Sequence, residues 1–131
     1  MTPFGAWDYC PWQHLGDLDG VELHFHWDGD TGVADFERRA ISLRRGMSGA
    51  QRRVTLAHEL IHLERGPVCE GATARVDELL VESATALRLI PVAVLEDLPR
   101  LVARYGVEAA ASFLAVDAQL VHVAIRALQT A

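Results

Sequence analysis

Five residues near the middle of the chain, His58-Glu59-Leu60-Ile61-His62, constrain its fold more than any other feature. In an α-helix, side chains four positions apart lie one above the other on the same face, so these two imidazole rings would be neighbours. Neighbouring imidazoles can bind one metal ion, and the glutamate beside the first histidine can then act on a water at that ion. The motif has this meaning only if the segment is helical.

The residues around the motif predict such a helix over positions 49–65. Ser48 and Gln51 have the spacing of a capping box, in which each residue bonds the backbone of the other at a helix N-terminus. No helix breaker comes after them until Gly66-Pro67, a typical stop. Six side chains give the helix a wide apolar surface: Val54, Leu56, Ala57, Leu60, Ile61 and Leu63. A buried helix that presents two histidines favours a zinc site over two unrelated core histidines.

Length and composition indicate one globular domain. The chain has 131 residues, 50% of them hydrophobic, and we expect residues 1–131 to form a single domain. No apolar segment is long enough to cross a bilayer, and the first residues lack the pattern of a signal peptide. We therefore expect a cytoplasmic protein in which Cys10 and Cys69 are free thiols. The net charge of −6 disfavours non-specific nucleic-acid binding, which needs clustered Lys and Arg.

A small sheet is predicted ahead of the motif helix. Residues 21–27 alternate apolar and polar side chains, and residues 40–44 place Ile41 and Leu43 on one face, as half-buried strands do. Residues 28–32 form a turn-like cluster between them. We expect the two strands to pair antiparallel and to pack on the motif helix.

The rest of the chain is predicted to be mostly helical, which makes the fold class α+β. Besides the motif helix, helices are expected over residues 9–19, 74–90, 91–104, 108–115 and 118–128. The core of the domain is expected over about residues 9–98, with a helical pair after it over about residues 107–129.

Two histidines leave a catalytic zinc site incomplete, because such sites usually have three protein ligands and a water. The helix predicted over 74–90 offers Asp77, Glu78 and Glu82. Glu78 is favoured as the third ligand, and Glu82, on the same face, would then hydrogen-bond to one of the ligand histidines. The alternative is that these carboxylates form a solvated stripe. Cys69 is a further candidate, although a structural cysteine is the simpler interpretation.

Other polar residues leave their roles open. His24 and His26 share the polar face of a predicted strand, where they are either a second metal site or, more simply, two partly exposed histidines. Peptide hydrolysis also needs a donor for the developing oxyanion besides the metal. The sequence does not choose among four candidates for that donor: Tyr105, His24, His26 and Arg75.

Several stretches together resemble the ImmA/IrrE family of metallopeptidases, particularly its small actinobacterial and actinophage members. The matching segments are Tyr9 to Trp12, Arg39 to Leu43, Ala50 to His62 and Glu78 to Pro91. In the last segment, Glu78, Glu82 and Leu89-Ile90-Pro91 keep the family's spacing. The similarity covers most of the chain and is specific around residues 50–63. It implies a gluzincin-like fold and raises Glu78 over its neighbours as third ligand.

The resemblance also implies a function. It suggests a zinc metalloendopeptidase with one Zn²⁺ held by His58, His62 and Glu78, and with Glu59 as the general base. The implied substrate is a helix-turn-helix repressor of a phage or mobile element, in a bacterial or phage-infected bacterial cell. The loop between His62 and Glu78 is short, and Glu82 stands where Asp or Asn is usual. The alternative is a zinc-binding regulatory or scaffold protein with weak or no proteolytic activity.

The C-terminal part, residues 108–128, also resembles the segment after the peptidase core in this family. Its apolar spacing is like that of a helix-turn-helix, but the outer face of its last helix carries little positive charge: Gln119, His122, Arg126 and Gln129. A helix that binds DNA needs basic and polar residues there. We expect this part to pack against the core, with no direct contact to nucleic acid or membrane.

Overall fold

The structure, a computed structural model, describes residues 9–68 and 71–130. Helix α2 spans Gly49–Arg65, which confirms the predicted bounds of the motif helix. At its N-terminus, Ser48 Oγ accepts the backbone N–H of Gln51, and the Gln51 side chain accepts the backbone N–H of Ser48, so the capping box is complete. The helix ends at Arg65, and the C-cap residue that follows, Gly66, has a φ of 86°, which favours glycine.

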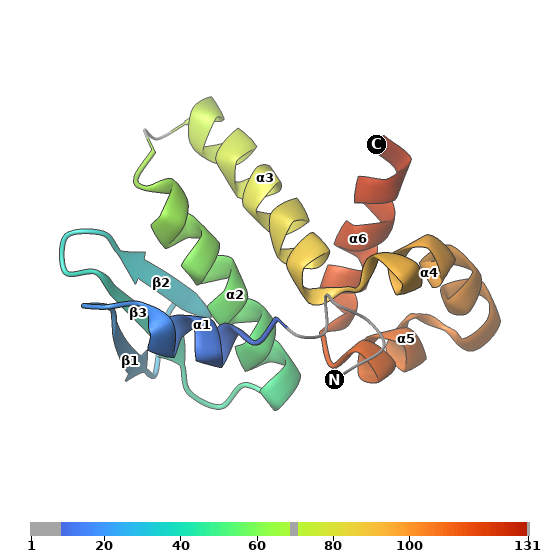
Figure 1. Ribbon diagram of the computed structural model, residues 1–131, viewed down its shortest axis with the longest axis horizontal. Coiled ribbons are helices and arrows are strands. Elements are labelled where there is room, and N and C mark those ends of the chain that lie inside the picture. Colours follow the sequence, from blue (N-terminus) through green and yellow to red (C-terminus); the bar gives the residue numbers. More distant parts are fainter. Residues whose placement is uncertain (1–8, 69–70, 131) are drawn as a thin grey trace.

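Six helices and one three-stranded sheet make up the described part, so the α+β class is confirmed. In chain order the other elements are α1 (Pro11–Asp17), β1 (Glu22–His26), β2 (Gly32–Asp35), β3 (Ala40–Arg44), α3 (Ala72–Leu89), α4 (Val92–Tyr105), α5 (Val107–Leu114) and α6 (Ala118–Thr130). Helix α2 lies across the sheet, α3 runs back beside α2, and α4, α5 and α6 gather at the far end of α3 (Figure 1).

The predicted antiparallel pairing of the two strands is wrong. Strand β1 pairs parallel with β3, with Leu23 opposite Ile41, and the sheet order is β1-β3-β2. Strand β2, whose first residue falls in the predicted turn, pairs antiparallel with the other edge of β3, with Gly32 opposite Leu43. After β1, which is one edge strand, the chain forms β2 at the opposite edge of the sheet. It then returns between the two as β3, the central strand. The sheet is therefore mixed, and β2 is one of its edges.

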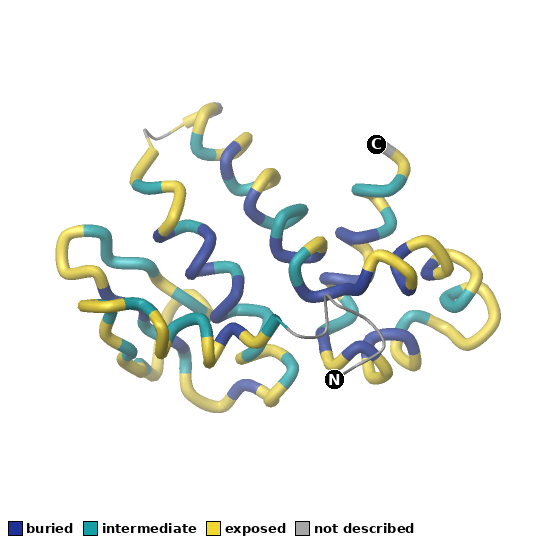
Figure 2. Tube along the Cα trace, viewed as in Figure 1, coloured by how far each residue is buried: buried dark blue, intermediate teal, exposed yellow. Residues whose placement is uncertain are grey.

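Two groups of buried side chains hold the layers together. The first lies between the sheet and α2, where four residues are completely buried: Ile41, Leu43, Leu56 and Leu60. Partly buried Leu15 and Leu18 extend this group beneath α1. Figure 2 shows the corresponding buried stretches of α2 and of the central strand.

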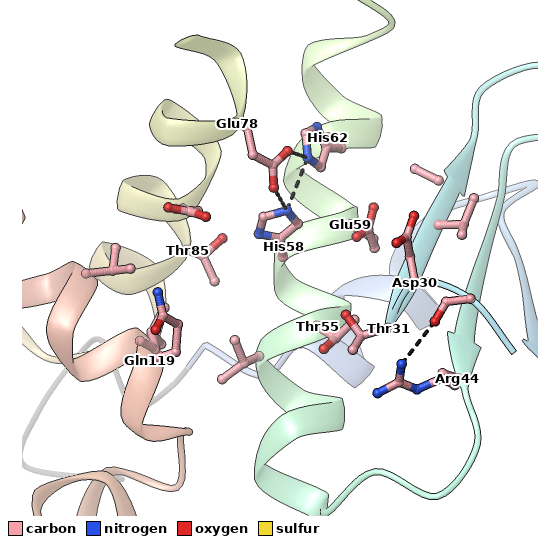
Figure 3. Close-up of a pocket in the computed structure, with 18 of the residues that line it drawn as sticks. Asp30, Thr31, Arg44, Thr55, His58, Glu59, His62, Glu78, Thr85 and Gln119 are labelled. Atoms are coloured by element: carbon pink, nitrogen blue, oxygen red, sulfur yellow. Dashed lines mark hydrogen bonds and ion pairs between the residues drawn. The ribbon is translucent and has the colours of Figure 1, made fainter. Parts of the chain in front are cut away.

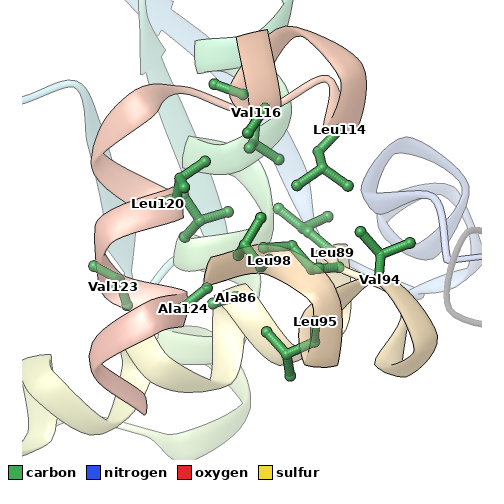
Figure 4. Close-up of a cluster of buried hydrophobic side chains, with 14 of the residues drawn as sticks. Ala86, Leu89, Val94, Leu95, Leu98, Leu114, Val116, Leu120, Val123 and Ala124 are labelled. Atoms are coloured by element: carbon green, nitrogen blue, oxygen red, sulfur yellow. The ribbon is translucent and has the colours of Figure 1, made fainter. Parts of the chain in front are cut away.

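The second group fills the space between α3, α4, α5 and α6. Four leucine side chains pack together there (Figure 4): Leu89, Leu98, Leu114 and Leu120. Ala57 of α2 packs against the same cluster. Each fully buried leucine contributes roughly 1.5–3 kcal/mol relative to an exposed one. This half of the molecule is therefore held mainly by apolar packing among helices.

The C-terminal helical pair packs against the rest of the described chain, as expected. Leu114 of α5 and Val121 of α6 are buried in the helical core. Arg53 of α2 also donates through Nη1 to the backbone carbonyl of Ala115 at 3.1 Å, which ties the turn between α5 and α6 to the motif helix. Among the described residues no single helix is long and apolar enough to span a membrane; α5 and α6 reach that length and hydropathy only as a pair bent by 98°.

Candidate metal centre

Three side chains from two helices converge on one point. Nε2 of His58 lies 2.7 Å from Oε1 of Glu78, and Nε2 of His62 lies 2.8 Å from Oε2 of the same carboxylate. The two Nε2 atoms are 3.2 Å apart. Glu78 points from α3 toward both rings on α2 (Figure 3). The structure therefore brings together the three residues that the sequence predicts as ligands.

This arrangement fits a metal ion. With bonds of about 2.1 Å, three ligand atoms of a tetrahedral site lie about 3.4 Å from one another. The observed separations between the three ligand groups are 2.7, 2.8 and 3.2 Å, so shifts of a few tenths of an ångström open the site to that size. In the described part of the chain, this is the group of His, Cys, Asp and Glu side chains with the geometry to hold a metal.

The helices set the position of each ligand. His58 and His62 are one turn apart on the face of α2 that looks toward α3, and both side chains are largely buried. Glu78 reaches them from α3 with 47% of its side chain exposed. The site is therefore built from two rigid elements, with its open side toward solvent near Glu78.

Burial also gives His58 the protonation state of a metal ligand. It lowers the pKa of His58, and this effect outweighs the nearby negative charge of Glu78, which raises it. A neutral imidazole is the form that binds metal. The charge of Glu82 also raises the pKa of His58, so Glu82 acts on this histidine through space. A hydrogen bond from Glu82 to a ligand histidine stays a prediction.

Asp77 has a place that the sequence does not predict. Its side chain is 4% exposed, and its Oδ1 accepts from Nε of Arg65 at 2.7 Å. Its Oδ2 lies 3.6 Å from Nδ1 of His62, on the side of the ring away from the ligand atom. The sequence shows Asp77 only as a candidate third ligand, because its burial depends on how α3 packs against α2.

Glu59 lies on the other side of α2, facing strand β2 and Asp30 (Figure 3). Its side chain is buried, and burial, together with the negative charges of Glu78 and Asp30, raises its pKa to about 7. Gly32 of β2 allows this arrangement. A Cβ atom at Gly32 would lie 2.5 Å from Cγ2 of Thr55 and 2.8 Å from Cγ of Glu59, closer than side chains pack.

A cavity of about 870 Å³ opens in front of these groups. His58, His62, Glu59 and Glu78 line it, together with residues of β2 and of the start of α6. Its walls also carry Thr31 and Thr55, which the sequence alone does not single out, and Gln119, which the sequence analysis assigned to the outer face of the last helix. The four candidates for stabilising an oxyanion do not line this cavity: Tyr105, Arg75, His24 and His26. The proposed ligand Cys69 lies outside the described residues.

The histidines of the sheet have other partners. Nε2 of His24 is 3.0 Å from a carboxylate oxygen of Glu22, and both side chains are exposed. His26 donates from Nε2 to the carbonyl of Asp30 at 2.7 Å and accepts from the Ser42 hydroxyl at 2.6 Å. Both ring nitrogens of His26 are thus occupied, and the second metal site considered for this strand does not form among the described residues.

The chain matches no model of a known protein family, and no curated protein matches it. The architecture and the group of possible metal ligands therefore rest on the chain's own residues.

Proposed function

We propose that this protein is a zinc-dependent endopeptidase with a small zincin-like fold of the ImmA/IrrE type. One observation carries the proposal: two imidazole nitrogens and a carboxylate converge beside a cavity that the carboxyl group of Glu59 also lines. Two histidines and a glutamate are the ligand set of many zinc peptidases. A solvated stripe of carboxylates would explain neither the convergence nor the buried glutamate.

The chain's own residues divide the chemistry between them. Zinc bound by His58, His62 and Glu78 would polarise a scissile carbonyl and lower the pKa of a water. Glu59 is the general base: it takes a proton from the attacking water and passes it to the leaving amine. In the metal-free protein burial raises the pKa of Glu59 to about 7. A group that first accepts and then returns a proton works best when its pKa lies near the ambient pH.

The surroundings of the site favour an extended peptide as substrate. Strand β2 is an edge of the sheet, and Gly32 and Val33 of this strand line the cavity beside Glu59. A peptide can add itself to such an edge as a further strand, held by main-chain hydrogen bonds. Together with the resemblance of the sequence to the ImmA/IrrE family, this supports a helix-turn-helix repressor of a phage or mobile element, cleaved in the bacterial cytoplasm.

The test combines metal content with cleavage. Zinc-loaded wild type and Glu59→Gln are each incubated with a helix-turn-helix repressor from the same genome and with a mixture of random peptides, and new termini are identified by mass spectrometry. We expect discrete cleavage by the wild type, a loss of at least about 100-fold in the variant, and one zinc per chain in both.

Two outcomes would contradict the proposal. Cleavage by Glu59→Gln at the wild-type rate would remove Glu59 from the reaction. A wild type that binds zinc but cuts neither the repressor nor any peptide would instead favour a metal-binding regulatory or scaffold protein.

A further inference from the structure

We infer that Asp77 is a positioning residue of the metal centre: its buried carboxylate holds His62 with Nδ1 protonated and Nε2 directed at the metal. The inference rests on the metal site of the proposed function and adds a residue on the far side of the ligand ring. In this inference Asp77 does not bind the metal. It takes the role that the sequence analysis gave to Glu82, which is to hydrogen-bond to a ligand histidine.

Burial is the first observation that calls for an explanation. Asp77 is 4% exposed, and a buried carboxylate is costly unless partners compensate for its lost hydration. Arg65 satisfies Oδ1, but Oδ2 is buried without a hydrogen-bond partner among the described residues. Buried polar atoms almost always have a partner, so the free oxygen indicates one that forms in another state of the site.

The position of Oδ2 of Asp77 indicates that its hydrogen-bond partner is His62. Oδ2 of Asp77 lies 3.6 Å from Nδ1 of His62, slightly beyond hydrogen-bond range. Metal binding requires the ligand atoms around Nε2 to move apart by a few tenths of an ångström, and a shift of about 0.5 Å in the His62 ring would bring Nδ1 within bonding distance of Asp77. A carboxylate that accepts the second N–H of a metal-bound histidine fixes its tautomer and raises its basicity.

Asp77 is distinct from the ligand group itself. The three ligand groups meet at Nε2 of His62, whereas Asp77 contacts the opposite nitrogen. Its other oxygen is held by Arg65, which comes from the last turn of α2. The ion pair therefore aims the carboxylate at His62 and keeps it from turning toward the metal.

A purely structural role for Asp77 is the rival explanation, because the ion pair with Arg65 also ties α3 to α2. The structure offers a matched control for that role. Arg88 of α3 forms a second tie to α2, with Nη1 and Nη2 donating to the two carboxylate oxygens of Glu64 at 3.0 and 2.7 Å. This second ion pair does not contact His58, His62 or Glu78.

The experiment compares zinc affinities by competition with a chromophoric chelator. Metal-free wild type, Asp77→Ala, Asp77→Asn and Arg88→Met are titrated with zinc, and a thermal melt confirms that each is folded. We expect Asp77→Ala to bind zinc about 10- to 100-fold more weakly than the wild type. Asp77→Asn keeps an acceptor and loses less, and Arg88→Met binds like the wild type.

A second measurement uses the wild type alone. In the zinc-loaded wild type, nitrogen-15 NMR of the histidine rings should show His62 coordinated through Nε2, with a slowly exchanging proton on Nδ1. Coordination through Nδ1, or rapid exchange of that proton, would overturn the inference.

The remaining outcomes separate the two proposals. Equal zinc affinity of Asp77→Ala and wild type, or an equal loss in Arg88→Met, removes the positioning role of Asp77. A wild type that binds no zinc overturns both this inference and the proposed function. A wild type that binds zinc and depends on Asp77, but cleaves nothing, keeps the inference and refutes only the peptidase.

Discussion

The two helices that carry the three possible metal ligands, α2 and α3, are held in different ways. Helix α2 starts at a complete capping box and is packed by the sheet, α1 and α3, so Leu56 and Leu60 are fully buried. Helix α3 starts at Ala72, and its N-cap residue, Gly71, provides no side-chain cap. Its outer face leaves four large apolar side chains about half exposed: Val76, Leu79, Leu80 and Leu87.

Because α2 is held by more of the fold than α3, the residues of the site differ in how firmly they are placed. The two histidines are placed by a helix that the rest of the fold already fixes. The glutamate is placed by a helix whose end near the site contacts α2, and these contacts include the ion pair of Asp77 with Arg65. A metal held by both helices would therefore act as a further tie between a well-supported element and a less supported one.

The largest effect is expected from removing a ligand. His58→Ala and Glu78→Ala should each weaken zinc binding by more than ~100-fold, because each ligand contributes roughly 3 kcal/mol of a total above 10 kcal/mol. Metal content after dialysis, measured by mass spectrometry, checks this. Glu96→Gln, which changes an exposed carboxylate on α4, is the control and should keep one zinc per chain. Full retention of zinc by Glu78→Ala would remove α3 from the site.

A comparably large effect concerns the buried carboxyl of α2. Burial raises the pKa of Glu59 from 4.5 to about 7, so the unfolded chain releases this proton at a lower pH than the folded one. The contribution of Glu59 to the stability of the metal-free protein should therefore be lost as the pH rises from 4.5 to 7, on the order of 3 kcal/mol in all. In urea unfolding with EDTA present, Glu59→Gln should be more stable than the wild type at pH 8 and equal to it near pH 4. The same difference at both values would contradict this prediction.

The features of the fold and of the candidate site that could be predicted from the sequence are those set by residues close together in the chain. The bounds of α2 follow from Ser48, Gln51 and Gly66, which act within one turn of each helix end. The spacing of His58 and His62 places their rings together in any helix. The bounds of the helix and the closeness of the two rings are confirmed, because nothing distant in the chain decides them.

The features that were missed depend on distant contacts. Strand β2 has only four residues and begins with glycine, so its strand character comes from pairing with β3 and not from its own side chains. Without β2, a parallel pairing of β1 with β3 has no visible crossover, and an antiparallel hairpin is the simpler prediction. Asp77 is likewise an ordinary acidic residue in the sequence, and its role appears only once α3 packs against α2.

Removing the metal should destabilise α3 more than α2. At a free zinc concentration 100 times the dissociation constant, binding stabilises the folded protein by about 2.7 kcal/mol. For a chain of this size, EDTA should lower the melting temperature by roughly 5–10 °C. Amide hydrogen exchange should accelerate more in α3, residues 72–89, than in α2, because α2 keeps its cap and its contacts with the sheet. If amide exchange accelerates equally in both helices, the metal stabilises α2 and α3 to the same extent.

The smallest of these effects tests how closely α2 fits against the sheet. In Gly32→Ala, the added Cβ would meet Thr55 at 2.5 Å and Glu59 at 2.8 Å, so both side chains of α2 must move away from β2. We expect a loss of about 1–3 kcal/mol in the free energy of unfolding, measured with urea. Gly16→Ala is the matched control, since no atom lies within 4 Å of its added Cβ and alanine favours the helix there. If the two variants unfold at the same urea concentration, the contact between β2 and α2 is looser than the structure indicates, and the position of Glu59 then depends on α2 alone.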